Sequence, residues 1–295
     1  MCIRDWIWTA NARLVDGRWL AMIGDGGYAL GARAGQIRDR LAGIDRADAD
    51  DMRAIHLDDR AVFIDRWRTL LLGLPWENGG DSADREAFRT ALNTWNGRAS
   101  VNAVGFRLVF EFRQRVYDKV FAALTAAVRE RDPEFRFQAS RQAEGALWRL
   151  LTERPVHLLP RPWESWEEFL LAMVDDTISG VGGDPGARSW GEANVAAIRH
   201  PLSAAIPVLS AWLDMPEDRL PGAVHMPRVQ RNSFGASERF AVSPGAEDEG
   251  YLHLPGGASG HPLSPFYRSG HEAWVAGEPV PFLPGETMHS LTLTP

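Results

Sequence analysis

Between residues 29 and 178, apolar residues recur every three or four positions, which is the period of an amphipathic helix. The longest such stretch covers residues 101–131 and is ended by Asp132-Pro133. Its apolar stripe consists of Val104, Leu108, Phe112, Val116, Val120, Leu124 and Ala127. The same spacing predicts helices over residues 29–41, 58–72, 83–95, 139–153 and 165–178, the last opened by a capping box of Ser165 and Glu168.

Short apolar runs bounded by turns predict strands at the two ends of the chain. They cover residues 3–15 and 19–23, and then 239–243, 251–254 and 288–294. So few strands do not make a compact domain alone, so we expect the later ones to complete a sheet begun elsewhere. The sequence therefore predicts an α+β fold with a strand-helix start (residues 1–58), a mainly helical middle (59–190) and a loop- and strand-rich end (191–295).

Composition excludes several classes of protein. The chain has 295 residues, 45% of them hydrophobic, and a net charge of -7 without a basic stripe, which argues against a nucleic-acid partner. It has no apolar run long enough to span a membrane. Cys2 is the only cysteine, so no disulfide forms within the chain, and the eight histidines lack the close spacing of a zinc site. We expect no metal centre from these residues.

Several polar positions have both a chemical and a structural interpretation. Asn11, near the end of a predicted strand, is suited either to donate its amide N–H to an oxyanion or to form a turn. Arg33, on the predicted helix 29–41, is either a surface charge or a buried organiser of a site. The glycines before it do not have the spacing of a dinucleotide-binding loop. The acidic pairs at 58–59 and 175–176 are interpreted as solvated charges at helix ends.

Seven short motifs occur in a fixed order along nearly the whole chain. They are W-T-A-N at residues 8–11 followed by Arg13, G-Y-A-L-G-A-R-A at 27–34 with Q-I-R at 36–38, L-D-D-R-A at 57–61, W-N-G-R-A-S at 95–100, M-P-R-V-Q at 226–230, L-P-G-G-A-S-G-H-P-L-S-P at 254–265 and G-H-E-A-W at 270–274. Together they resemble the penicillin acylase family, one of the N-terminal-nucleophile amide hydrolases. The matching stretch is the carboxy-terminal part of the family's large subunit.

The resemblance implies a fold and a chemistry. The family fold is an αββα sandwich, which we expect here in part. Its members hydrolyse linear amides through a serine at the start of the large subunit. By motif, Asn11 matches the asparagine of the family's oxyanion hole and Arg33 its active-site arginine. Ala12 stands where family members usually have a second asparagine. Calcium is common in the family, but the resemblance assigns no ligand here.

The same resemblance implies that this chain works with another part. The family's nucleophilic serine lies well upstream of the W-T-A-N stretch, so we expect a separately supplied front half that carries the small subunit and the nucleophile. The substrate would be a small acylated amide. Family members are usually periplasmic or secreted, although no signal peptide is present in this sequence. Alone, the chain is expected to be inactive and to expose apolar surface and sheet edges. An inactive remnant, or a scaffold that binds without catalysis, is the alternative hypothesis.

Overall fold

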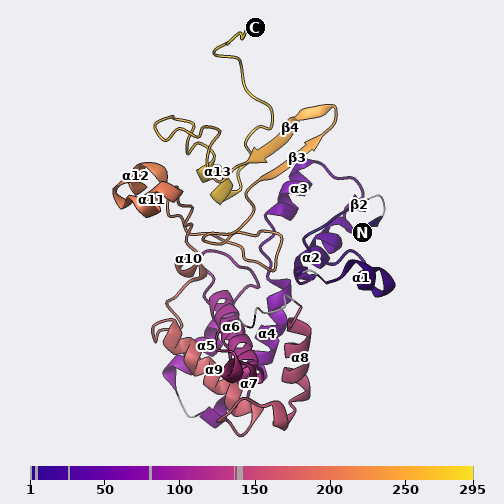
Figure 1. Ribbon diagram of the computed structural model, residues 1–295, viewed down its shortest axis with the longest axis vertical. Coiled ribbons are helices and arrows are strands. Elements are labelled where there is room, and N and C mark those ends of the chain that lie inside the picture. Colours follow the sequence, from indigo (N-terminus) through magenta and orange to yellow (C-terminus); the bar gives the residue numbers. More distant parts are fainter. Residues whose placement is uncertain are drawn as a thin grey trace.

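A computed structural model describes residues 2–3, 6–25, 27–79, 82–135, 137 and 142–294. A helical body lies at one end of the molecule, the start of the chain lies between this body and the later strands, and the C-terminal stretch lies at the other end (Figure 1). The helices of the body are α4 (Val62–Leu72), α5 (Ala83–Thr94), α6 (Val104–Leu124), α7 (Ala126–Arg131), α8 (Glu144–Glu153) and α9 (Trp166–Gly180), with short 3-10 turns at Trp76–Gly79 and Val156–Leu158. Each of the helices predicted between residues 58 and 178 has its counterpart here.

Helix α6 is the centre of this body and packs against α4, α5 and α9. Leu108, Phe112, Val116 and Val120 of its predicted apolar stripe are entirely shielded from solvent, whereas Leu124, at the end of α6, is 43% exposed. Close approach to α5 occurs at Gly105, where an added Cβ would lie 2.5 Å from both the Ala91 carbonyl oxygen and the Trp95 Cβ. The pattern of one helix thus organises a single large core that also includes Trp67, Phe88 and Phe169.

Boundaries differ from the sequence prediction where polar contacts override the apolar period. Helix α4 begins at Val62 rather than at residue 58, because residues 58–61 are a loop held by other partners. The predicted helix 101–131 is interrupted at Thr125, whose hydroxyl donates to the Phe121 carbonyl at 2.7 Å. Helix α8 begins at Glu144, and residues 139–141 of its predicted range lie outside the described residues. Ser165 caps α9 as predicted, accepting from the Glu168 N–H at 3.0 Å, but the Glu168 carboxylate accepts from the Glu164 N–H at 2.9 Å and does not complete the predicted capping box.

The beginning of the chain is more helical than predicted. Strands β1 (Cys2–Ile3) and β2 (Trp6–Ile7) form a two-residue antiparallel pair, so the predicted strand over 3–15 is wrong beyond Ile7. Residues 19–23 belong to helix α1 (Gly17–Ile23), not to a strand. Leu20, Ala21 and Met22 favour a helix, and none of the residues of α1 is buried against a neighbouring strand. Helices α2 (Ala32–Leu41) and α3 (Ala49–His56) follow, and α3 was not predicted.

The end of the chain consists of loops, short helices and one hairpin. The helices are α10 (Trp190–Ala193), α11 (Pro201–Ala205), α12 (Ser210–Leu213) and α13 (His271–Ala276), with a 3-10 turn at Pro207–Leu209. Strands β3 (Arg239–Ser243) and β4 (Ala246–His253) pair antiparallel, with Arg239 opposite His253. The predicted strand over 288–294 is wrong: these residues are irregular, and Leu291 and Leu293 are exposed.

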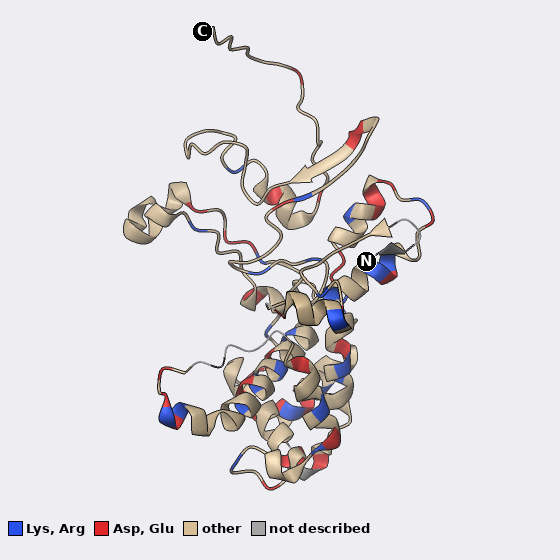
Figure 2. Cartoon of the chain, turned by 45° about the vertical axis from the view of Figure 1, so that its right-hand side comes forward, with Lys and Arg blue, Asp and Glu red and all other residues tan. Residues whose placement is uncertain are grey.

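Helices and small antiparallel sheets together make an α+β chain. In the described part of the chain, β1–β2 and β3–β4 are two separate two-stranded sheets, so the later strands do not extend a sheet begun by the first ones. Opposite charges are interspersed over the helical body, whereas the terminal stretch after β4 carries few (Figure 2). Apolar side chains are exposed at both ends of the chain, among them Ile7, Met22, Ile23, Leu263 and Met288.

Candidate functional site

A cavity of about 690 Å³ lies where the start of the chain meets the helical body and the loop before β3. Its polar lining residues are Asn11, Arg33, Arg113, Gln114, Tyr117, Glu144 and His225. Apolar side chains such as Leu30, Val229 and Phe234 complete the wall. A mixed lining with a few convergent polar groups is typical of a small-molecule site.

Both candidate residues from the sequence line this cavity and contact each other. One guanidinium nitrogen of Arg33, Nη2, donates to the Ala10 carbonyl at 2.9 Å and to Asn11 Oδ1 at 2.5 Å. Arg33 stands in the first turn of α2, and the Ala29 N–H donates to the Asn11 carbonyl at 2.8 Å. The loop before α2 is therefore fastened to the Asn11 segment at both backbone and side chain.

The contact with Arg33 fixes how the Asn11 amide is turned. A guanidinium carries only donors, so the atom facing it must be the amide oxygen. The Nδ2 hydrogens of Asn11 then have no partner among the described residues and are available to a ligand. The backbone of Asn11 is left-handed, with φ of 59°, a conformation that asparagine tolerates better than most residues. Burial lowers the pKa of the Arg33 guanidinium.

A buried carboxylate forms the wall opposite the chain start. Glu144 is 3% exposed and accepts from Arg113 Nη2 at 2.6 Å, from the Trp67 indole at 2.9 Å and from Arg66. Burial alone would raise the pKa of Glu144, but the charge of Arg113 and these hydrogen bonds outweigh it and lower the pKa. The carboxylate is thus ionised and ties together α4, α6 and α8.

Two further polar side chains line the cavity, Tyr117 and His225. The Tyr117 hydroxyl is fully buried and makes no hydrogen bond within the described residues. His225 packs against Phe63 with ring centres 4.7 Å apart and the ring planes tilted by 56°. Burial, with the charge of Arg113, lowers the pKa of His225 to about 4, so its imidazole is neutral at neutral pH.

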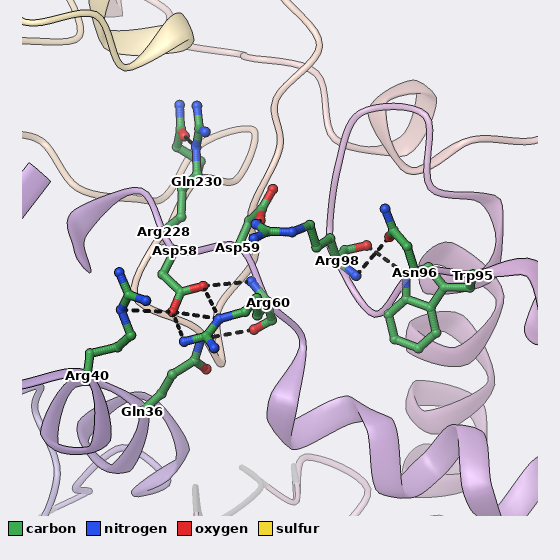
Figure 3. Close-up of polar contacts among 10 residues, drawn as sticks. All are labelled: Gln36, Arg40, Asp58, Asp59, Arg60, Trp95, Asn96, Arg98, Arg228 and Gln230. Carbon is green, nitrogen blue, oxygen red and sulfur yellow. Dashed lines mark hydrogen bonds and ion pairs between the residues drawn. The ribbon is translucent and has the colours of Figure 1, made fainter. Parts of the chain in front are cut away.

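A polar junction outside the cavity lining joins three distant motifs (Figure 3). Residues 57–61 and 95–100 run side by side, with the Ala61 N–H donating to Gly97 at 2.8 Å and the Ala99 N–H to Asp59 at 2.9 Å. The Arg228 N–H of the third motif donates to the Asp58 carbonyl at 3.1 Å.

Side chains of this junction also hold the helix that carries Arg33. Gln36 of α2 donates to the Arg60 carbonyl at 3.1 Å, and Arg40 of α2 approaches Asp58 at 4.0 Å. The junction therefore anchors α2 one turn beyond Arg33 (Figure 3).

The acidic pair in this junction corrects an expectation from the sequence. Asp58 and Asp59 are 5% and 8% exposed rather than solvated. Asp58 accepts from the Arg60 N–H at 3.1 Å and from its guanidinium at 2.6 Å, and Asp59 pairs with Arg98. Burial alone would raise the pKa of Asp58, but the hydrogen bonds from Arg60 and Gln36 outweigh it and lower the pKa. The second pair is different, because Asp175 is half exposed and bound to Arg85.

Comparison with known proteins identifies the family of this chain. A sequence model of the penicillin amidase family matches residues 2–287. The chain belongs to the penicillin amidase family. A curated relative, the penicillin acylase 2 proenzyme of Pseudomonas sp. (strain SE83), is 26% identical over 264 residues, which cover 85% of this chain and 33% of that protein. The chain thus spans about a third of the length of this relative.

The penicillin amidase match and the geometry bear on different residues of the cavity. Motif resemblance singled out Asn11 and Arg33, and the structure brings them together. The motif resemblance did not indicate Arg113, Tyr117, Glu144 or His225, which also line the cavity. The sequence offers one signal, a charged Arg113 directly after Phe112 in the long apolar helix. In the structure Arg113 is 8% exposed, so this charge lies on the buried side of α6.

Among the described residues, no group of three or more His, Cys, Asp or Glu side chains is placed to hold a metal ion. Asp25 is paired with Arg13. No helix among the described residues is long and apolar enough to cross a membrane.

Proposed function

We propose that this chain contributes to an enzyme that hydrolyses linear amides, releasing an acyl group and an amine. The observation that carries the proposal is the contact between Arg33 and Asn11 on the wall of one cavity. Membership of the penicillin amidase family supports the same reaction class.

Asn11 and Arg33 have distinct roles in this proposal. Attack on an amide carbonyl develops negative charge on its oxygen, and a donor already oriented toward that oxygen lowers the barrier. Asn11 offers its unpartnered Nδ2 hydrogens for this purpose. Arg33 holds the amide oxygen, so it fixes the direction of the Nδ2 donors, and its positive charge favours the oxyanion.

We propose further that the attacking hydroxyl comes from a separate front portion with its own amino-terminal serine. A match to only a third of the relative leaves room for such a portion. The hydroxyl would form an acyl-enzyme ester as the amine leaves with a proton, and water would then release the carboxylic acid. In this assembly, residues 1–58 bring the site pair, residues 59–190 the helical wall and residues 191–295 the rest of an αββα sandwich.

Hydrolysis of an N-acyl-4-nitroanilide by the full chain co-purified with that front portion tests the proposal, because release of 4-nitroaniline is coloured. Arg33→Ala should lower kcat/KM by at least tenfold, since it frees the Asn11 amide and removes a charge from the cavity. Arg38→Ala is the matched control: Arg38 pairs with the neighbouring Asp39 and is absent from the lining of this cavity, so its loss should leave the rate unchanged. An assembled, folded complex with no turnover would favour the inactive remnant or binding scaffold.

A further inference from the structure

The Tyr117 hydroxyl is a buried hydrogen-bonding group without a partner in the described part of the chain. The side chain is 9% exposed, projects from α6 and lines the cavity, yet its oxygen has no hydrogen-bond partner among the described residues. Buried polar groups in folded proteins are nearly always paired, and those that are not call for an explanation. A ligand oxygen in the cavity would provide the missing partner.

His225 gives the same wall a second unpartnered polar group. Its ring packs on Phe63, and neither ring nitrogen forms a hydrogen bond within the described part of the chain. A neutral imidazole can donate from one nitrogen and accept at the other, so it accommodates a carbonyl, hydroxyl or carboxylate equally well.

The charges around these two groups decide which kind of ligand atom is preferred. Arg113 lies 6.0 Å from the Tyr117 ring centre, and Arg33 lines the same cavity. Glu144 is the one ionised carboxylate in the described lining, and it is shared by Arg113 and Arg66. The excess of positive charge favours an oxygen that accepts hydrogen bonds.

We propose that Tyr117 and His225 form a polar subsite that binds an acceptor oxygen, of a carbonyl or a carboxylate, carried by the substrate beyond its scissile amide. The inference rests on the proposed function in assigning that oxygen to an amide substrate. The subsite selects among substrates and takes no part in bond cleavage.

Binding to the full chain tests the subsite without requiring turnover. Three amides of 4-nitroaniline with five-carbon acyl groups serve as probes: pentanoyl, which has no distal oxygen, 4-oxopentanoyl and glutaryl. By titration calorimetry, the two oxygen-bearing amides should bind about five- to tenfold more tightly than the pentanoyl amide, as one added hydrogen bond provides. Tyr117→Phe and His225→Phe keep the rings and should each remove most of that preference.

Matched variants separate loss of the subsite from loss of the fold. Tyr117→Phe should melt at the same temperature as the parent or higher, because it deletes an unpartnered hydroxyl. Tyr267→Phe is the control: it breaks the hydrogen bond from Tyr267 to the Leu213 carbonyl, 2.6 Å long, and should lower the melting temperature while keeping the preference.

The outcomes distinguish this inference from the proposed function. A preference for the glutaryl amide alone, lost in Tyr117→Phe, would identify the oxygen as a carboxylate. Equal affinity of the parent chain for all three probes, or a preference that survives both Tyr117→Phe and His225→Phe, would overturn the inference. Tight, Tyr117-dependent binding without hydrolysis in the assembled complex would leave the subsite standing and count against the amidase function.

Discussion

Replacing Glu144 by glutamine would show how much of the cavity wall depends on one buried charge. The Glu144 carboxylate accepts hydrogen bonds from Arg113, Arg66 and the Trp67 indole. Glutamine has nearly the same shape, but it is uncharged and presents an NH2 group where an oxygen now faces a guanidinium. The substitution therefore removes the charge and places donor against donor.

The magnitude follows from the burial of the partners. Arg113 is 8% exposed, and its Nε and Nη2 both donate to Glu144 Oε2, at 3.2 Å and 2.6 Å. Breaking a buried ion pair from one side costs about 3–5 kcal/mol, because the remaining charge is left unpaired. The side chain of Arg66 is 34% exposed and recovers some hydration, so its loss adds little. We expect Glu144→Gln to lower the free energy of unfolding by about 3–4 kcal/mol.

Urea denaturation followed by tryptophan fluorescence measures this directly, since Trp67 is itself a donor to Glu144. Glu153→Gln is the control: Glu153 pairs with Arg149 on the surface of the same helix, so its loss should cost less than about 0.5 kcal/mol. A change below about 1 kcal/mol for Glu144→Gln, with an unchanged denaturant slope, would refute the idea that this carboxylate is essential to the wall.

Two further predictions concern packing and pH. Gly105→Ala should lower the free energy of unfolding by about 1–3 kcal/mol, because the added Cβ would lie 2.5 Å from the Ala91 carbonyl oxygen of α5. Gly145→Ala is the control, because the space around Gly145 is open, and it should raise the free energy of unfolding by about 0.5–1 kcal/mol. Equal effects of the two substitutions in urea denaturation would contradict this. His225, with its pKa lowered from 6.5 to about 4, is protonated more readily when unfolded, so stability present above pH 6.5 is lost as pH falls toward 4. Between pH 7 and 4.5 the parent should lose on the order of 2 kcal/mol more than His225→Phe, and parallel pH profiles would rule this out.

The helical body could be predicted from the sequence because its apolar positions repeat with one period over long stretches. Residues 101–131 show this most clearly, although α6 begins only at Val104, and the break at Thr125 escaped because it depends on a local hydroxyl contact. The chain start was misjudged because a short apolar run between turns resembles a strand, although Leu20, Ala21 and Met22 favour a helix. Helix α3 was missed although its capping box of Asp48 and Asp51 is readable.

Some residues of the candidate site could likewise be predicted from the sequence, and others could not. Asn11 and Arg33 were found because they belong to contiguous motifs. Tyr117 and Glu144 come from different helices, and only the packing of α6 against its neighbours brings them to the cavity. The sequence predicts surface charges at Asp58 and Asp59 because it does not show that Arg60 and Arg98 neutralise them in a buried junction.

The turnover of an Asn11→Ala enzyme tests the central claim most directly. With the full chain assembled with its front portion, kcat for an N-acyl-4-nitroanilide should fall by about 10²–10³, as when one oxyanion donor is removed. Asn93→Ala, on the exposed side of α5, should leave kcat unchanged. An Asn11→Ala enzyme with the turnover of the parent would contradict the assignment of this cavity as the site of amide hydrolysis.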